Sequence, residues 1–204
     1  VAALIYKAIG DQSTAVLIDH GLLRKNEGRD CVNALKTGLD VNINMFDESD
    51  IFLSKLEGVT DPEKKRKIIG NQFIYSFDRI AGEMGDMQFL AQGTLYPDVI
   101  ESGVSKGKTA HVIKSHHNVG GLPDDMTFKL VEPLRELFKD EVRNVGRELG
   151  LPESLIERHP FPGPGLAVRI IGEITEERIQ ILQDADQVYM DILHEDGLYN
   201  DIWQ

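Results

Sequence analysis

The chain has 204 residues, of which 41% are hydrophobic, and 34 acidic against 22 basic residues give a formal net charge of −12. This size and apolar content suffice for one hydrophobic core and exclude a disordered protein, and no apolar run is long enough for a transmembrane helix. The acidic balance argues against general nucleic-acid binding, while the single cysteine, Cys31, excludes an internal disulfide and a cysteine-based zinc site. With no visible signal peptide, we expect a cytoplasmic protein.

Both ends of the chain have the character of cut ends. Residues 1–9 show the pattern of a buried helix, but they include neither an initiating Met nor a residue that would cap the helix. At the other end, a helical pattern at residues 175–193 is followed by apolar residues with no clear partner. We interpret the chain as a fragment of a longer protein, in preference to a small domain with frayed ends.

Strand-like and helix-like patterns alternate through the first 150 residues. Strands are expected at residues 14–18, 41–45, 89–91 and 110–113, and helices at residues 1–9, 22–35, 60–80, 139–149 and 152–158. Ser49 is expected to cap a further short helix. The helix from residue 60 has the strongest start, with Thr60 as N-cap, Pro62 in the first turn and Glu63 closing a capping box. This alternation predicts an α/β fold, with a parallel sheet covered by helices on both faces.

Two long irregular segments interrupt this pattern. Residues 92–125 are rich in Gly, Ser, Lys and His, and a loop of this length in a compact domain is usually functional. Residues 159–165, His-Pro-Phe-Pro-Gly-Pro-Gly, break all regular structure. We therefore place a domain boundary after residue 160, with a strand expected at residues 166–171 and a helix at residues 175–193 beyond it.

Ligands of such sheets bind beyond the carboxyl ends of the strands, and three segments fall there: residues 19–21, residues 92–94 and the long loop that follows. Within that loop, residues 103–109 come close to a Walker-type phosphate loop. They fail on spacing, because three residues instead of four separate Gly103 from Gly107. We interpret this segment as a flexible basic hairpin.

Two carboxylates, Asp98 and Glu101, lie three residues apart and would share one face of a helical turn. Such a pair suits Mg²⁺, which proteins often bind through one or two carboxylates together with substrate phosphates. The alternative is a solvated acidic turn without a bound metal.

Residues 113–121 form the densest polar cluster and include Lys114, His116 and His117. Adjacent histidines on a regular element point apart, which argues against a shared zinc site. Two interpretations stay open. The histidines lie on the surface, or a mobile loop, helped by the two glycines that end the cluster, brings a cation and imidazoles to a phosphate.

A basic run, Lys-Lys-Arg-Lys at residues 64–67, lies inside an expected helix. Such runs are usually solvated, but four consecutive residues cover all sides of a helix, so at least one side chain can point inward. In an acidic chain this run is a candidate site for an anionic substrate.

Cys31 lies in the middle of another helix. The glycines that commonly surround a nucleophilic cysteine are missing directly around it, and we interpret it as structural.

Five strings occur together and in this order: residues 65–70 (KRKIIG), 91–94 (AQGT), 96–102 (YPDVIES), 113–123 (IKSHHNVGGLP) and 159–166 (HPFPGPGL). In this combination the chain resembles the GMP synthetase family over essentially its whole length. The resemblance implies that residues 1–160 are an ATP-pyrophosphatase domain, with the doubly wound, mostly parallel sheet of adenine-nucleotide α-hydrolase-like proteins. Residues 161–204 would then begin a smaller α+β dimerisation domain.

The resemblance also implies an activity. The family activates xanthosine monophosphate (XMP) with ATP and Mg²⁺, forming an adenylyl-XMP intermediate and pyrophosphate, and ammonia then displaces AMP to give GMP. The pyrophosphate-binding loop Ser-Gly-Gly-Val-Asp-Ser would precede residue 1, and the 204 residues contain neither the glutaminase nor most of the dimerisation domain through which a homodimer would form. We therefore predict this function for a longer parent protein and expect the fragment alone to be inactive.

Individual roles follow from the same resemblance. ATP would be contacted by the backbone of Ile18, the ring of Phe73, the close-approaching Gly93 and the phosphate-binding Lys139. Catalysis would depend on Lys139 and on three residues of the lid, Lys114, His116 and His117. Arg66 would bind XMP. Asp98 and Glu101 would form an acidic pair near Mg²⁺.

Two alternatives stay open from the sequence alone. The first is another ATP-pyrophosphatase, such as NAD synthetase or a tRNA-thiolating enzyme, although the latter would favour catalytic cysteines and a basic surface. The second is a nucleotide-binding regulatory domain that has lost its catalytic loop. The sequence upstream of Val1 would distinguish them, because a Ser-Gly-Gly-Val-Asp-Ser string there indicates a pyrophosphatase loop.

Overall fold

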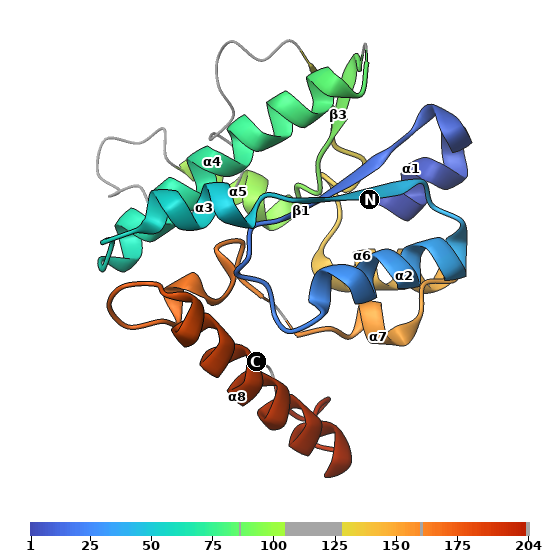
Figure 1. The fold of residues 1–204 in the computed structure, drawn as a ribbon. Helices are drawn as coiled ribbons and strands as arrows, with labels where there is room; N and C mark the ends of the chain where they lie inside the picture. Colours follow the sequence, from blue (N-terminus) through green and yellow to red (C-terminus); the bar gives the residue numbers. More distant parts are fainter. Residues whose placement is uncertain (86, 105–127, 160, 203–204) are drawn as a thin grey trace.

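The computed structural model describes residues 1–85, 87–104, 128–159 and 161–202, which form an α/β fold (Figure 1). In chain order its strands are β1 (Ala15–Asp19), β2 (Ile43–Asp47), β3 (Phe89–Ala91) and β4 (Lys129–Val131). Its α-helices are α1 (Ala2–Ile9), α2 (Glu27–Leu39), α3 (Ser49–Leu56), α4 (Pro62–Glu83), α5 (Tyr96–Val104), α6 (Lys139–Glu148), α7 (Glu153–Ile156) and α8 (Glu176–Glu195). Two short 3₁₀ helices are η1 (Gly10–Gln12) and η2 (Gly165–Val168). None of the described helices combines the length and the apolar character needed to cross a membrane.

The strands form two parallel pairs. β1 pairs with β2 in the register Ala15 to Ile43, and β3 pairs with β4 in the register Phe89 to Lys129. The parallel arrangement and the α/β class predicted from the alternating pattern are confirmed. Among the described residues, however, the strands form two separate two-stranded sheets. β4 was not expected from the sequence, and the strand expected at residues 110–113 lies outside the described residues.

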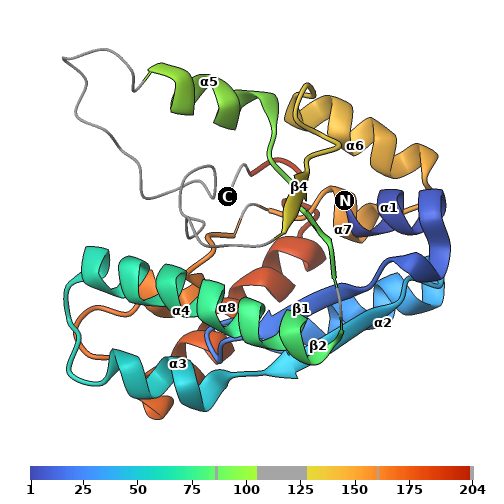
Figure 2. The same ribbon diagram turned by 90° about the horizontal axis from the view of Figure 1, so that it is seen from above.

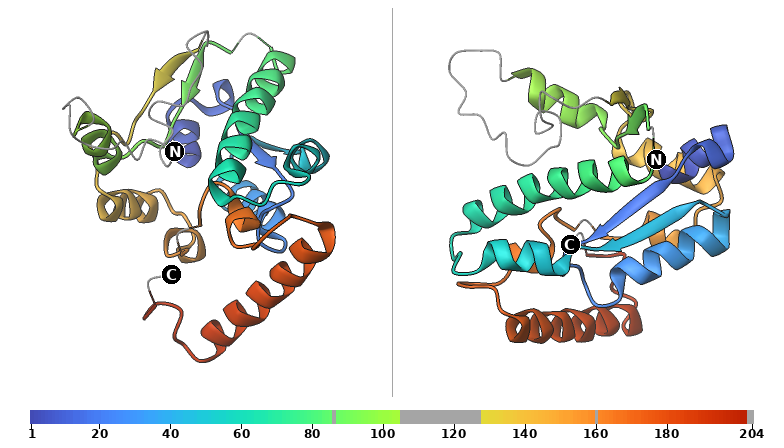
Figure 3. Two further views of the ribbon diagram at one scale, coloured as in Figure 1. Left: turned by 90° about the vertical axis from the view of Figure 1, so that its left-hand side faces the viewer. Right: turned by 45° about the horizontal axis from the view of Figure 1, so that its top comes forward.

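Helices cover the β1–β2 sheet on both sides, with α4 on one side and α2 on the other (Figure 3). This arrangement explains the continuous apolar run of β1, because a strand with helices on both faces has no solvent side. Ile18 of β1 joins Phe52, Ile69 and Ile80 in the main hydrophobic cluster. A second cluster contains Ala3, Val32, Val41 and Ile43 and holds α1 and α2 against β2.

The expected strand at residues 166–171 is wrong, because this segment begins as the 3₁₀ helix η2. Gly165 has a positive φ of 60° and packs so closely on the Leu22 carbonyl oxygen that a Cβ atom would lie 2.1 Å from it. The Leu166 N–H donates to the same oxygen at 2.7 Å. Leu166 and Ala167 are fully buried, and Ala167, with Ile170 farther along, belongs to the main cluster. The close contact of Gly165 and the hydrogen bond of Leu166, both to the Leu22 carbonyl, hold the start of this segment in a turn.

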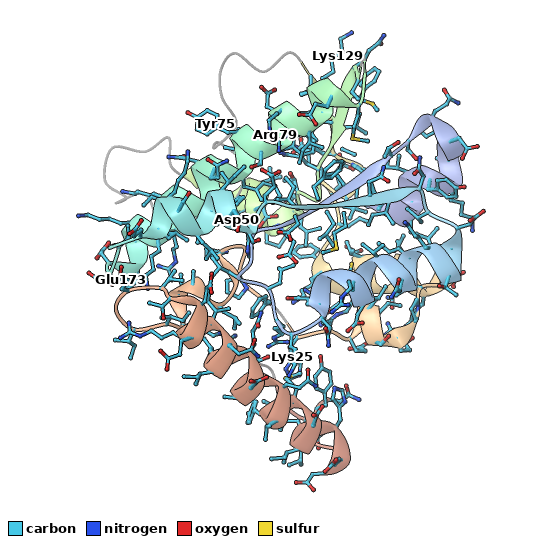
Figure 4. All side chains as sticks on the ribbon, in the orientation of Figure 1. Lys25, Asp50, Tyr75, Arg79, Lys129 and Glu173 are labelled. Carbon is cyan, nitrogen blue, oxygen red and sulfur yellow. The ribbon has the colours of Figure 1, made fainter. Side chains whose placement is uncertain are left out.

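Helix α8 begins after Thr175, whose Oγ1 accepts a hydrogen bond from the Arg178 N–H, and the predicted helix from this position is confirmed. Three side-chain contacts tie α8 to the β1–α2 connection: Arg24 Nε lies 3.1 Å from Asp186 Oδ2, Lys25 Nζ lies 2.6 Å from Asp184 Oδ1, and Gln183 Nε2 donates to the Leu23 carbonyl. Figure 4 shows Lys25 at this contact. The outer surface of α8 exposes apolar side chains: Ile181, Val188, Tyr189 and Ile192.

Several helix starts differ from the expected ones. Helix α2 begins at Glu27 instead of residue 22, because Leu22 is fully buried beneath η2 and the Glu27 carboxylate accepts the Arg24 N–H. The N-cap of α4 is Asp61, not Thr60, because Asp61 Oδ1 accepts the Lys64 N–H at 2.8 Å. The expected capping role of Ser49 is also wrong.

Helix α3 includes Ser49 as its first residue, and the Ser49 hydroxyl instead donates to Asp47 Oδ1 at 2.6 Å. The helix expected at residues 152–158 is shorter, and ends as α7 at Ile156.

His20 links the end of β1 to the Pro-Gly segment at residues 161–165. Its buried ring accepts the Leu22 N–H at Nδ1 (3.1 Å) and donates from Nε2 to the Gly163 carbonyl (3.2 Å). This pair of bonds requires a neutral ring protonated on Nε2, since an N–H cannot donate to a protonated Nδ1. Burial lowers the pKa of His20, against weaker opposing effects of the Gly163 carbonyl and the Asp19 and Glu27 carboxylates.

We expect His20 to make the stability of the fold depend on pH. The folded state takes up the His20 proton less readily than the unfolded chain, in which the imidazole pKa is about 6.5. The contribution is therefore complete above about pH 6.5 and is lost as the pH falls through the window down to the lowered pKa of the folded state. Urea unfolding at a series of pH values should show a smaller loss of stability on acidification in His20→Gln than in the wild type. Identical pH dependence in both proteins would contradict this assignment.

Candidate functional site

A cavity of about 450 Å³ lies where the β3–α5 connection meets α6, α7 and the segment that follows α7. Figure 2 shows α1, α6 and α7 together on this side of the molecule. The side chains and backbone of the following residues form its walls: Val1, Gly93, Leu95, Leu134, Lys139, Val142, Arg143, Gly146, Leu151, Leu155, Ile156, Arg158, His159 and Phe161. This volume lies in the range of small-molecule and cofactor sites.

The polar part of the cavity wall is cationic. Lys139, Arg143 and Arg158 line the cavity, and none of the described lining residues is acidic. Arg158 pairs with Glu27 at 2.6 Å and Arg143 Nη1 with Asp140 at 3.5 Å, while the Nε atom of Arg143 is buried and finds no acceptor among the described residues. In a chain with a net charge of −12, such a concentration of basic side chains makes this cavity a candidate binding site for an anion.

The start of helix α6 also lies at this wall, and its first turn carries two acidic residues, Asp140 and Glu141, that partly offset the positive helix end. Lys139 is the first residue of this helix of ten residues. The unpaired N–H groups and the dipole of a helix place partial positive charge at its N-terminus, where anions bind favourably. Apart from His159, the remaining side chains of the wall are apolar and include Leu95, Leu134 and Val142. The cavity can therefore hold a ligand that has an anionic part and an apolar or aromatic part.

Hydrogen bonds between two connections fix one wall of the cavity. The Thr94 hydroxyl donates to Glu132 Oε1 at 2.6 Å, and the Tyr96 N–H donates to the Leu137 carbonyl at 3.0 Å. The hydroxyl of Thr94, together with Arg135, lowers the pKa of the Glu132 carboxyl group. Glu132 therefore stays ionised and accepts the hydrogen bond from Thr94. The bonds hold Gly93, next to Thr94, opposite the start of α6.

Two of the residues expected to bind ATP, Gly93 and Lys139, therefore line the same cavity although 46 positions separate them in the sequence. The other two lie elsewhere. Ile18 is buried within the main cluster, and Phe73 is 39% exposed on α4. Neither is among the residues that line the cavity.

Arg66 lies on α4 and is half-exposed, with its Nη1 atom 3.2 Å from Glu63 Oε2 one turn earlier. An exposed ion pair of this kind contributes little to stability and leaves the guanidinium available to a stronger anion. The inward-pointing member of the basic run is the preceding residue, Lys65, which is fully buried.

The acidic pair expected near Mg²⁺ is only partly described. Asp98 lies in the first turn of α5, and its Oδ2 atom accepts the Leu95 N–H at 2.8 Å. Glu101 belongs to the same helix, but its side chain lies outside what the structure describes. Within the described part of the chain, no three His, Cys, Asp or Glu side chains are grouped as a metal site would require.

The expected lid residues Lys114, His116 and His117 also lie outside the described residues. Cys31 is partly buried in α2, and burial raises the pKa of its thiol, which agrees with its interpretation as a structural residue.

Sequence reasoning missed Arg143, Arg158 and His159 in the cavity wall. The signal for His159 was its place at the start of the string at residues 159–166, and Arg158 directly precedes that string.

Comparison with known proteins gives a consistent result. The chain is 62% identical over 203 residues to the GMP synthase [glutamine-hydrolyzing] of Lactobacillus delbrueckii subsp. bulgaricus. It is 58% identical to the protein of that name from Carboxydothermus hydrogenoformans and 57% identical to the one from Staphylococcus epidermidis. In each case the alignment covers 100% of this chain and 39% of the relative, so the chain spans about two fifths of the length of these proteins. No protein-family model matches the chain. The resemblance inferred from the five sequence strings is confirmed along the whole chain.

Proposed function

We propose that this chain is the ATP-pyrophosphatase part of a glutamine-hydrolysing GMP synthase, followed by the start of its dimerisation part. The observation that carries the proposal is the identity of 56–62% along the whole chain to proteins of that name. The complete protein would adenylylate XMP with ATP, releasing pyrophosphate. Ammonia would then displace AMP from the adenylyl-XMP intermediate to form GMP.

The cationic cavity supports this proposal, because ATP and the released pyrophosphate are polyanions. We assign Lys139 to phosphate binding and Gly93 to close backbone approach of the nucleotide, since both line that cavity. Ile18 and Phe73 remain proposed adenine contacts. Transfer of an adenylyl group depends mainly on positioning the reactants and on cations that stabilise charge developing on the phosphates.

Lys114, His116 and His117 complete the proposed catalytic set, as groups of a lid that closes over the phosphates. Asp98 and Glu101 would hold Mg²⁺, and the described carboxylate of Asp98 is the hard oxygen donor that this ion prefers. When bound, the metal ion would neutralise charge on the ATP phosphates.

Neutralising either acidic residue should raise the Mg²⁺ concentration needed for half-maximal rate. The reason is that Asp98→Asn or Glu101→Gln removes the negative charge of a hard oxygen ligand while keeping its size. Titration of the rate with Mg²⁺ at saturating ATP measures the effect, with the exposed Asp50→Asn of α3 as a control. Unchanged titrations in both variants would identify a solvated acidic turn.

The finer architecture is part of the same proposal. We infer that the β1–β2 and β3–β4 pairs are parts of one doubly wound parallel sheet in the complete protein, completed by chain outside these residues. Residues 161–204 would start the dimerisation part, and the exposed apolar face of α8 would be covered there. The proposed partners are XMP, glutamine-derived ammonia and a second copy of the protein. A cytoplasmic location remains a prediction.

The test of the proposed function is a reconstituted reaction. The complete protein, given Mg-ATP, XMP and ammonium, should release one pyrophosphate for each GMP formed, whereas the 204-residue chain alone should form none. Nicotinic acid adenine dinucleotide in place of XMP tests the NAD synthetase alternative. Pyrophosphate release that depends on that substrate, or no release with any substrate, would refute the proposal.

Arg66 provides a test of the proposed XMP site. Arg66→Ala should raise KM for XMP by roughly tenfold to a hundredfold, because a hydrogen bond to a charged group contributes about 1.5–3 kcal/mol, while KM for ATP changes little. Lys67→Ala, at an exposed position next to Arg66, is the matched control. Steady-state kinetics with each substrate varied in turn decide the question, and equal changes in both KM values would indicate disruption of α4 instead.

A further inference from the structure

A stack of three aromatic rings adjoins the cationic cavity. The ring of His159 lies on one face of Tyr199, with centroids 4.0 Å apart and an interplanar angle of 10°. His194 lies on Tyr199 as well, at 4.2 Å and 16°. His159 is 7% exposed and lines the cavity between Arg158 and Phe161. The stack thus connects the wall of the cavity to the chain that follows α8.

Tyr199 also holds His159 by two hydrogen bonds. The Tyr199 hydroxyl oxygen accepts the backbone N–H of His159 at 3.0 Å, and the Tyr199 carbonyl oxygen lies 2.7 Å from His159 Nε2. A carbonyl oxygen can only accept, so the proton of a neutral His159 ring lies on Nε2. Nδ1 is then the ring atom left to interact with a ligand. Because the oxygens of a phosphate group only accept hydrogen bonds, contact with a phosphate requires a second proton on Nδ1, which turns the ring into a cationic donor.

This fixation decides which ring atom of His159 can meet a ligand. A hydrogen bond on one ring nitrogen sets both the tautomer and the orientation of an imidazole ring, so the other nitrogen is presented in a defined direction. Tyr199 alone fixes the ring plane, the tautomer and the backbone of His159. The neighbouring Arg158 supplies positive charge to the same wall, and none of the described lining residues is acidic. This environment favours an anionic group next to the ring.

We propose that His159 is a further binding residue of the cavity, contacting a phosphate group of the bound nucleotide, and that Tyr199 is its positioning residue. This inference rests on the proposed function, because it takes the ligand of the cavity to be ATP. It makes the affinity of the cavity depend on a residue 40 positions along the chain, beyond the end of α8. A purely structural His159 would instead affect stability and leave affinity unchanged.

The experiment uses the complete protein and isothermal titration with Mg-ATP, and with inorganic pyrophosphate as a second probe. His159→Gln should raise the Kd for both probes roughly tenfold or more, because a hydrogen bond to a charged group is lost. Tyr199→Phe keeps the ring stack and the carbonyl contact but removes the hydroxyl acceptor, and should raise Kd about threefold. Tyr189→Phe, at an exposed position of α8, is the matched control and should bind as the wild type does.

Two further readouts separate positioning from folding. In the His159→Gln background, Tyr199→Phe should have no additional effect on Kd, since Tyr199 acts through His159. The ¹⁵N shifts of the His159 ring should report a proton on Nε2, and Nδ1 should shift when pyrophosphate is added. Unchanged Kd values in folded His159→Gln, or additive effects of the two substitutions, would overturn the inference. A wild type that binds neither probe would refute the proposed function as well, which distinguishes the two failures.

Discussion

Lys139→Ala is expected to lower the rate of adenylyl transfer by about 10²–10³, equivalent to roughly 3–4 kcal/mol of transition-state stabilisation. Lys139 opens helix α6 and lines the cationic cavity opposite Gly93. In the proposed function, removal of its ammonium group would take away a positive charge at the place where negative charge develops on the phosphates. Substrate binding should suffer less, because Arg143, Arg158 and the start of α6 still attract the polyanion.

Pyrophosphate release by the complete protein in a single turnover measures this step separately from the later reaction with ammonia. Lys36→Ala, at an exposed position in the last turn of α2, is the matched control and should leave the rate unchanged. Lys139→Arg tests geometry, because a guanidinium keeps the charge but cannot replace the compact ammonium group. A Lys139→Ala enzyme with near-normal single-turnover rate would remove Lys139 from the chemistry.

The parts of the fold that follow from local patterns could be predicted from the sequence. The apolar run of β1 and the Thr175 start of α8 depend on residues close in sequence, and both agree with the structure to within a few residues. The N-cap of α4 was displaced by one residue, because Thr60 and Asp61 are both good caps and only the geometry of the turn selects Asp61.

The larger error, the strand expected at residues 166–171, results from long-range packing. Residues 166–171 have the apolar, β-branched composition of a strand, yet they form a turn because Gly165 lies on the Leu22 carbonyl and Lys65 binds the carbonyls that follow. Those partners are about 100 or more positions away, so no local pattern can reveal them. Intrinsic propensity gives way to tertiary contacts in such segments.

At the candidate site, too, contacts between residues distant in the sequence could not be predicted. Gly93 and Lys139 could be assigned to one ligand only from the resemblance, and the structure brings both to one cavity. The contributions of Arg143 and His159 come from side chains that meet in space without a shared motif. His159, for example, is fixed by Tyr199, which has no distinguishing sequence context.

Substitution of Lys65 is expected to cause a large loss of stability. Its side chain is fully buried in α4, and its Nζ atom donates to the carbonyls of Ala167 (3.3 Å), Ile170 (2.7 Å) and Gly172 (2.7 Å). Burial lowers the pKa of Lys65, and the nearby Arg178 guanidinium lowers it further. Holding a charged group there is costly, so the three carbonyl contacts must offset that cost.

Lys65→Met should therefore lower the free energy of unfolding by about 3 kcal/mol, because a side chain of similar length leaves the three carbonyls without their donor. The cost of burying the ammonium is also removed, which keeps the loss below the sum of three hydrogen bonds. Urea unfolding measures the change, and Lys64→Met, at the exposed neighbouring position, should stay within about 0.5 kcal/mol of the wild type. Amide exchange should accelerate first in residues 165–174, because Lys65 is the group that fixes their backbone on α4. Wild-type stability in Lys65→Met would show instead that burial of Leu166, Ala167 and Ile170 is sufficient to hold this segment.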